Sequence, residues 1–161
     1  MQPKEEIEAQ YNTPDPWAYK SNPEDARRKK YLIHMANMFG PYERVLDIGA
    51  GEGWITQDYP GKVLHGLELS EQARSRMPSR VVGITEPEGM YDLVVGTGIL
   101  YGHYDWELFL RIISTHSSRY ILLSNIKAWE HESVRLMPGK QLLEMSFPFH
   151  QYHQQLRIFE R

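Results

Sequence analysis

Short apolar runs alternate with polar, helix-like or turn-like segments through the middle of the chain. The runs have the length and composition of buried strands. We predict strands at residues 44–49, 62–69, 80–85, 91–96 and 119–125. Because strands separated by crossovers form parallel sheets, this order predicts an α/β fold. The expected architecture is a doubly wound, mostly parallel sheet in a three-layer sandwich.

The two ends of the chain have different patterns. Polar and apolar residues alternate in KQLLEMSF (140–147) and QLRIFER (155–161), which predicts a C-terminal antiparallel hairpin. Residues 13–23 hold three prolines among aromatic residues and are typical of a loop. We therefore expect an N-terminal arm and helix, residues 1–40, beside a sheet-forming part, residues 41–161, in one domain overall.

Capping residues mark where helices should begin. Helices are expected after three polar residues, Asn22, Ser70 and Asp105. The first should end at Gly40-Pro41. Shorter helices are predicted at 54–59 and at 127–137, whereas residues 86–90 leave almost no room for one. The predicted fold is therefore a pared-down version of its class.

Composition narrows the class of protein. The 161 residues are 41% hydrophobic and 24% charged, with a net charge of −3 and no cysteine. These values favour one globular domain and exclude disulfides and thiolate metal sites. We expect no membrane span and no secretory signal, and we expect a cytoplasmic location. This charge does not favour nucleic acid as a partner. The basic run 27–30 is interpreted as a solvated helix face, with a nucleic-acid or phosphate contact as the alternative.

The stretch VLDIGAGEGW carries the candidate chemistry. Asp47 lies in the first strand, and Gly49, Gly51 and Gly53 follow at every second position. Glycines at the ligand edge of such a sheet allow close backbone approach and positive φ angles. A dinucleotide fingerprint requires glycine where Trp54 stands, and a carboxylate is a poor neighbour for a pyrophosphate. The pattern therefore favours a ligand with an ammonium group over NAD.

A second acid completes this pattern. Glu68 ends the second strand, 21 residues after Asp47. An acid at that position can accept hydrogen bonds from both hydroxyls of a ribose. An adenosine with an amino-acid tail satisfies both carboxylates, so the predicted cofactor is S-adenosyl-L-methionine (SAM).

These segments resemble class I SAM-dependent methyltransferases over about residues 40–161. VLDIGAGEGW resembles their motif I, DLVVGTGILYG their fourth-strand motif, and the closing hairpin their last two strands. PDPWAY, near the N-terminus, is similar to the start of the NodS-like branch, whose named member N-methylates an aminosugar. The resemblance implies cofactor contacts at Asp47, Gly49, Ala50, Gly51, Gly53, Glu68, Leu69, Thr85 and Gly96. Whether Thr85 or Glu86 serves the adenine is left open.

Candidate residues for the acceptor side follow the fourth strand. The resemblance places Tyr101 and His103 in the acceptor-facing loop, where His103 could act as a base or be an ordinary surface residue. Trp17 and Tyr19 could form a lid over the cofactor or simply anchor the arm.

Other aromatic residues and histidines are assigned structural roles. Trp106 and Trp129 are interpreted as core or helix-face residues. No metal site is expected, because the spacing of His150 and His153 does not match a known ligand motif.

The predicted function is methyl transfer from SAM to a nitrogen or oxygen of a small polar metabolite or sugar. Two alternatives remain. One is a non-catalytic module that binds SAM or S-adenosylhomocysteine (SAH). The other is a nicotinamide-dependent oxidoreductase, which the missing third glycine and Asp47 disfavour.

Overall fold

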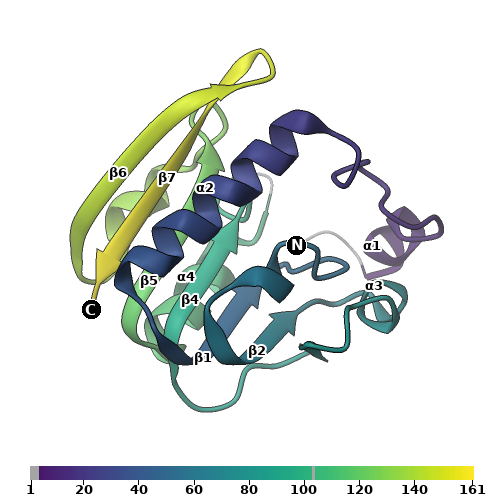
Figure 1. Ribbon diagram of the computed structural model, residues 1–161, viewed down its shortest axis with the longest axis horizontal. Helices are drawn as coiled ribbons and strands as arrows, with labels where there is room; N and C mark the ends of the chain where they lie inside the picture. Colours follow the sequence, from purple (N-terminus) through teal and green to yellow (C-terminus); the bar gives the residue numbers. More distant parts are fainter. Residues whose placement is uncertain (1–3, 103) are drawn as a thin grey trace.

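A computed structural model describes residues 4–102 and 104–161. Within them lies one seven-stranded sheet of order β3-β2-β1-β4-β5-β7-β6 (Figure 1). Its strands are β1 (Tyr42–Ile48), β2 (Gly61–Leu67), β3 (Val81–Ile84), β4 (Tyr91–Thr97), β5 (Ser117–Ile126), β6 (Lys140–Phe149) and β7 (Tyr152–Glu160). Strands β1 to β5 are parallel, and β7 runs antiparallel between β5 and β6. The predicted doubly wound sheet with a C-terminal hairpin is confirmed.

Helices begin at the residues that the sequence marks as caps. The helical elements are α1 (Lys4–Gln10), α2 (Pro23–Phe39), η1 (Thr56–Asp58), α3 (Glu71–Ser75), α4 (Trp106–His116) and η2 (Glu132–Leu136). The side chains of Asn22, Ser70 and Asp105 each accept a backbone N–H of the first turn that follows, at 3.0, 3.1 and 3.1 Å. Helix α1 has no counterpart among the predicted helices.

Two predicted helices are wrong in extent. The segment 54–59 forms only the 3₁₀ turn η1, because the Thr56 hydroxyl donates to Asp47 and Pro60 follows directly. The segment 127–137 forms only η2. Residues 127–129 form a turn, in which the Trp129 N–H donates to the Ile126 carbonyl (3.0 Å). Tertiary contacts then hold the next residues: Glu130 forms a bridge with Tyr101, and the N–H of His131 donates to the carbonyl of Leu100 (2.8 Å).

Side chains of the central strands point alternately into two separate cores. Helix α2 covers one face of the sheet and α4 the other, as Figure 1 shows. The α2 side buries Leu32, Ala36, Val45, Leu93, Leu122 and Leu156. The α4 side buries Ile113, Leu46, Val94, Ile121 and Leu123. Neighbouring residues of one strand thus belong to opposite cores, which explains why the strands are apolar almost throughout.

The crossover from β3 to β4 is an irregular segment, as residues 86–90 predict. Arg44 holds it by donating to the carbonyls of Glu88 and Met90, both at 2.9 Å. Val63 and Val82 remain 40% and 52% exposed on this part of the sheet. The pared-down architecture is confirmed here.

The N-terminal part contains two different kinds of structure. Helix α2 supplies Leu32, Met35 and Ala36 to the core, whereas none of the described residues before Leu32 is among the buried members of either main core cluster. Residues 11–21, which we call the arm, lie across the glycine loop instead. Whether residue 40 is a domain boundary stays a prediction. Within the described residues, no helix is both long and apolar enough to cross a membrane.

Candidate functional site

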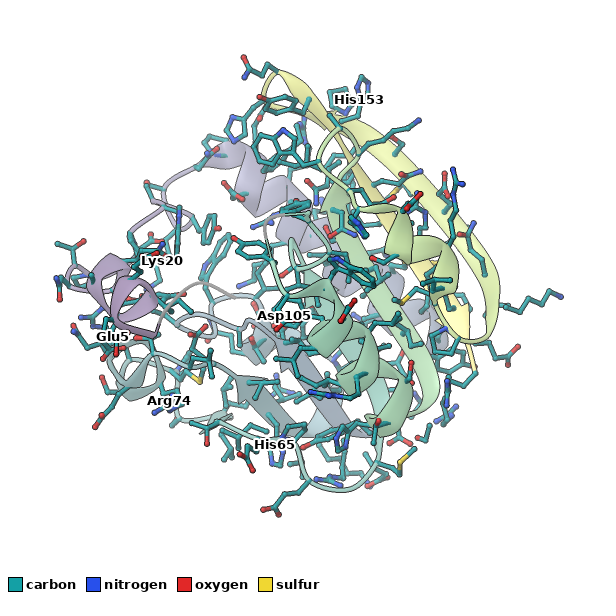
Figure 2. The ribbon with its side chains drawn as sticks, turned by 180° about the vertical axis from the view of Figure 1, so that it is seen from behind. Glu5, Lys20, His65, Arg74, Asp105 and His153 are labelled. Carbon is teal, nitrogen blue, oxygen red and sulfur yellow. The ribbon has the colours of Figure 1, made fainter. Side chains whose placement is uncertain are left out.

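A cavity of about 1170 Å³ lies beyond the carboxyl ends of the parallel strands. Strand β1 lies between β2 and β4, so the strand order reverses direction at β1. Ligands of open α/β sheets bind at such a switch point. The glycine loop after β1 and the residues that follow β2 form one wall. The arm, the residues after β4 and the start of β7 form the others. In Figure 2, the labelled Lys20 lies on the arm near α1, and Asp105 lies at the start of α4.

The glycine loop is shaped for close approach. Gly49 and Gly51 have φ angles of 69° and 55°, in the left-handed region that side chains disfavour. The N–H groups of Gly49 and Ala50 both donate to the Leu67 carbonyl, at 2.9 and 3.2 Å. A Cβ at Gly51 would lie 2.9 Å from the Tyr11 hydroxyl. The arm therefore rests directly on this loop.

Asp47 is a buried carboxylate that lines the cavity. Its Oδ2 accepts the Thr56 hydroxyl at 2.6 Å, while Oδ1 is buried with no hydrogen-bond partner among the described residues. Burial raises the pKa of Asp47 to about 7, although the Thr56 hydrogen bond opposes the shift. A buried acceptor without a partner suits a donor with positive charge.

We expect Asp47 to make the free protein less stable as the pH rises. Its pKa is raised from 3.8 to about 7 on folding, so between these values the folded chain holds a proton that the unfolded chain releases. Stability then falls as the pH rises through this window. Asp47→Asn should remove the dependence and raise the melting temperature at pH 8 by a few degrees. The exposed Asp58→Asn serves as control; equal pH slopes in parent and Asp47→Asn would contradict the assignment.

Glu68 organises the loop that follows β2. Its Oε2 accepts the Gly51 N–H at 3.0 Å and its Oε1 the Ser70 N–H at 2.9 Å. Burial raises the pKa of Glu68, and these backbone hydrogen bonds act against the shift. Each carboxylate oxygen has a second lone pair, so Glu68 can still accept two hydroxyl groups from a ligand. Arg74, labelled in Figure 2, donates to the Glu68 and Leu69 carbonyls at 2.6 and 2.8 Å.

Four aromatic rings connect the arm to the glycine loop. We call Tyr11, Trp17, Tyr19 and Trp54 the arm aromatic cluster. Trp17 contacts Tyr11 edge-on and stacks on Tyr19, with ring centroids 5.3 and 5.7 Å apart. Tyr19 continues the series to Trp54 at 6.3 Å. All four rings line the cavity, so the arm forms part of its wall.

Glu52 holds the arm against the glycine loop through hydrogen bonds and an ion pair. The sequence patterns did not identify this residue. Its carboxylate accepts the Asp15 N–H and the Arg76 guanidinium, both at 3.0 Å, and pairs with Lys20 at 3.4 Å. Burial alone would raise its pKa, but these hydrogen bonds lower it below the usual value. The Arg76 guanidinium also donates to the Tyr11 carbonyl at 2.8 Å. Its partners lie far away in the sequence, so no local pattern could have identified Glu52.

A second group of rings lies across the cavity. We call Tyr101, Tyr104, Trp129 and Tyr152 the sheet-edge aromatic cluster. Tyr101 contacts Tyr104 and Trp129 at centroid distances of 6.0 and 5.8 Å, and Trp129 contacts Tyr152 at 4.8 Å. The Tyr101 hydroxyl accepts the Ile126 N–H at 2.9 Å, and burial raises its pKa. His103, the predicted base, lies outside the described residues.

Most of the predicted site residues share this cavity. It is lined by Trp17, Tyr19, Asp47, Gly49, Ala50, Gly51, Glu68, Leu69, Thr85 and Tyr101. Gly53 and Gly96 lie outside its lining: a Cβ at Gly53 would meet Met77 and Pro78, and one at Gly96 would meet Ile99. Thr85 and Glu86 both line the cavity, so the choice between them stays open.

The basic run 27–30 is a solvated face only in part: Lys30 is exposed, whereas Arg28 and Lys29 face the interior. Arg28 is 9% exposed, lines the cavity and pairs with Asp25 at 2.9 Å. Its guanidinium faces the rings of Tyr19 and Phe149 at 5.2 and 5.5 Å. Lys29 contacts the Trp54 carbonyl and Asp58. The interpretation as a solvated face was wrong for Arg28 and Lys29, because α2 directs them to the arm and to the segment after the glycine loop.

The histidines of the hairpin have separate surroundings. His150 pairs with Glu24 at 3.0 Å, while His153, labelled in Figure 2, lies at the start of β7. His131 caps η2. Across residues 4–102 and 104–161, no three histidine, cysteine, aspartate or glutamate side chains gather as metal ligands would.

Comparison with known proteins places the fold. No family model and no curated protein matches the sequence. Among solved structures, N-methyltransferase NodS from Bradyrhizobium japonicum WM9, in complex with SAH, has a TM-score of 0.81 at 16% identity, covering 98% of this chain and 97% of that chain. Magnesium protoporphyrin IX methyltransferase (ChlM) from Synechocystis PCC 6803, with bound SAM, has a TM-score of 0.74 at 15% identity, covering 100% and 98%.

A third structure shows that this fold is not confined to methyltransferases. The cyclase SpnF has a TM-score of 0.65 at 10% identity and covers 85% of this chain and 80% of that chain. At these identities the likeness concerns the fold alone. The chain has the fold of the SAM-dependent methyltransferases.

Proposed function

We propose that this protein is a methyltransferase that binds SAM in the cavity above β1 and β2. The observation that carries the proposal is the pair of buried carboxylates at the glycine loop. Asp47 has an unpartnered oxygen, and Glu68 has two oxygens that can accept further hydrogen bonds. A ligand with an ammonium group and a ribose complements both acids, whereas the pyrophosphate of NAD would face negative charge.

The residues present fit this cofactor. Asp47 would hold the ammonium group, Glu68 the ribose hydroxyls, and Leu69 with Thr85 or Glu86 the adenine side. Gly49 and Gly51 leave room for the amino-acid end of the ligand. When bound, the cofactor supplies an electrophilic methyl group on a sulfonium.

The chain itself would align the acceptor and exclude water. Methyl transfer requires an aligned acceptor atom with a free lone pair, and little acid–base chemistry beyond that. The arm aromatic cluster and the sheet-edge aromatic cluster enclose the space beside the glycine loop, which supports a lid role for Trp17 and Tyr19. The proposed acceptor atom is a nitrogen or oxygen of a small molecule. The roles of His103 as base and of a polar metabolite or sugar as acceptor stay predictions.

Incubation with SAM that carries a labelled methyl group tests this proposal. We expect label to move from SAM to at least one member of a panel of small aromatic, aliphatic and sugar amines and alcohols. Glu68→Ala should abolish the transfer at cofactor concentrations that saturate the parent. The alternative, a non-catalytic binding module of the same fold, predicts SAH binding without transfer to any member of the panel.

A further inference from the structure

One buried amide side chain in the cavity wall has a carbonyl oxygen without a hydrogen-bond partner among the described residues. Gln154, on β7, is 1% exposed and lines the cavity. Its Nε2 donates to the Ser124 hydroxyl at 2.6 Å, while its Oε1 is buried without a hydrogen-bond partner among the described residues. Buried polar atoms are almost always satisfied, so an unpartnered carbonyl oxygen at a cavity wall indicates a missing donor.

Gln154 lies at the base of the sheet-edge aromatic cluster. In the sheet it is paired with Ile126 of β5, whose N–H donates to the Tyr101 hydroxyl. The turn after Ile126 carries Trp129, and Tyr152 begins the strand that contains Gln154. Four rings from three separate segments therefore line the same cavity as this one hydrogen-bond acceptor. Trp129 remains 46% exposed, although two of these rings pack against it, so part of its surface is available to a ligand.

Gln151, His150 and Arg28, which line the same cavity, each have a partner for at least one polar group. Gln151 donates to the Tyr152 hydroxyl at 2.9 Å, and His150 pairs with Glu24. Arg28 pairs with Asp25 one turn away on α2, and its buried Nε has no hydrogen-bond partner among the described residues. A sugar would bury several hydroxyl groups among aromatic rings, with few free partners for them. A flat ring with a single donor group needs only apolar surface and one acceptor. The sheet-edge aromatic cluster supplies the surface, and Gln154 supplies the acceptor.

We propose that the methyl acceptor is an aromatic molecule whose ring packs on the sheet-edge aromatic cluster and whose N–H or O–H group donates to Oε1 of Gln154. This inference rests on the proposed function, because it names the substrate class of the same cavity. Gln154 touches the acceptor in this arrangement and selects for a donor group. An aromatic molecule with a donor group thus replaces the polar metabolite or sugar as the favoured acceptor class.

A matched pair of probes isolates this hydrogen bond. 2-Naphthol and 2-methoxynaphthalene share one ring system, but only the first has an O–H donor. In the presence of saturating SAH, calorimetry should show that the parent binds 2-naphthol about tenfold more tightly than 2-methoxynaphthalene. Glucosamine, which has the sugar ring and an amine, should bind more weakly than either.

Variants then assign the effect to residues. Gln154→Met keeps the size of the side chain and should bring the affinity for 2-naphthol down to that for 2-methoxynaphthalene, with SAH affinity unchanged. Gln154→Glu retains an acceptor and should preserve the preference for 2-naphthol. Gln155→Met is the matched control on the same strand, because Gln155 contacts Glu144 and lies outside the cavity lining. Trp129→Ala should weaken binding of both naphthalenes equally.

The outcomes separate this inference from the proposed function. Failure of the parent to bind SAH would overturn the proposed function. SAH binding with tighter binding of glucosamine than of 2-naphthol would overturn only the aromatic acceptor. An unchanged preference for 2-naphthol in a folded Gln154→Met protein would overturn the role of Gln154. Melting curves confirm that each variant is folded.

Discussion

Removal of residues 1–20 is expected to leave a folded domain that no longer transfers methyl groups and has lost most of its affinity for SAH. Within residues 4–31, no side chain is a buried member of either main core cluster, and the deletion keeps Asn22, which caps α2. The deletion does remove Trp17, Tyr19 and the Tyr11 hydroxyl above Gly51. The cavity wall would open to water, so we expect a loss of SAH affinity of more than about tenfold.

The competing account treats the arm as an anchor only. It predicts a lower melting temperature with unchanged SAH affinity in the folded fraction. A truncated protein that melts like the parent and binds SAH equally well would refute both accounts. The arm is fastened by Glu52, which accepts from Asp15 and Arg76, so Glu52→Gln should reproduce part of the effect with the whole chain present.

Single tryptophans allow a finer comparison. Trp17 is 44% exposed and contacts mainly other rings of the arm aromatic cluster. Trp17→Ala should therefore lower SAH affinity and turnover with little change in melting temperature. Trp106→Ala is the control, since Trp106 packs on the α4 core and on His131, outside the cavity lining. It should lower the melting temperature and leave SAH affinity unchanged.

Glu68→Ala is expected to cause the largest loss of cofactor affinity from a single substitution. Charge-assisted hydrogen bonds to two ribose hydroxyls are worth about 2–4 kcal/mol together, or roughly 30- to 1,000-fold in SAH affinity. The Gly51 and Ser70 N–H groups also lose their acceptor, so melting curves must accompany the titration. Glu71→Ala, an exposed acid at the start of α3, is the matched control. Parent-like SAH binding by Glu68→Ala would show that the ribose partner is misassigned.

The features predicted correctly from the sequence depend on neighbouring residues. The caps Asn22, Ser70 and Asp105 act on the turn that follows each of them. The position of Asp47 and Glu68 at one edge of the sheet could be predicted from the strand patterns, while their contacts with a cofactor stay a prediction. Local spacing is enough for such features.

The features that were missed depend on contacts between distant parts of the chain. The predicted helix at 127–137 is replaced by η2 because the Leu100 carbonyl accepts a hydrogen bond from the His131 N–H and Arg157 pairs with Glu130 at 2.6 Å. The role of Glu52 depends on Asp15, 37 residues away, and that of Gln154 on Ser124, 30 residues away. Trp129 was interpreted as a core or helix-face residue, but it is 46% exposed and lines the cavity, which no local pattern reveals.

Calorimetric titration of the parent protein with SAH and, separately, with NAD is the most direct test of the central claim. Asp47 lies where the pyrophosphate of NAD would need a positive or neutral neighbour, and Asp47 and Glu68 offer acceptors to the ammonium group and the ribose of SAH. We predict that SAH binds with a micromolar dissociation constant and that NAD gives no saturable heat. Tighter binding of NAD than of SAH would contradict the assignment of this cavity to SAM.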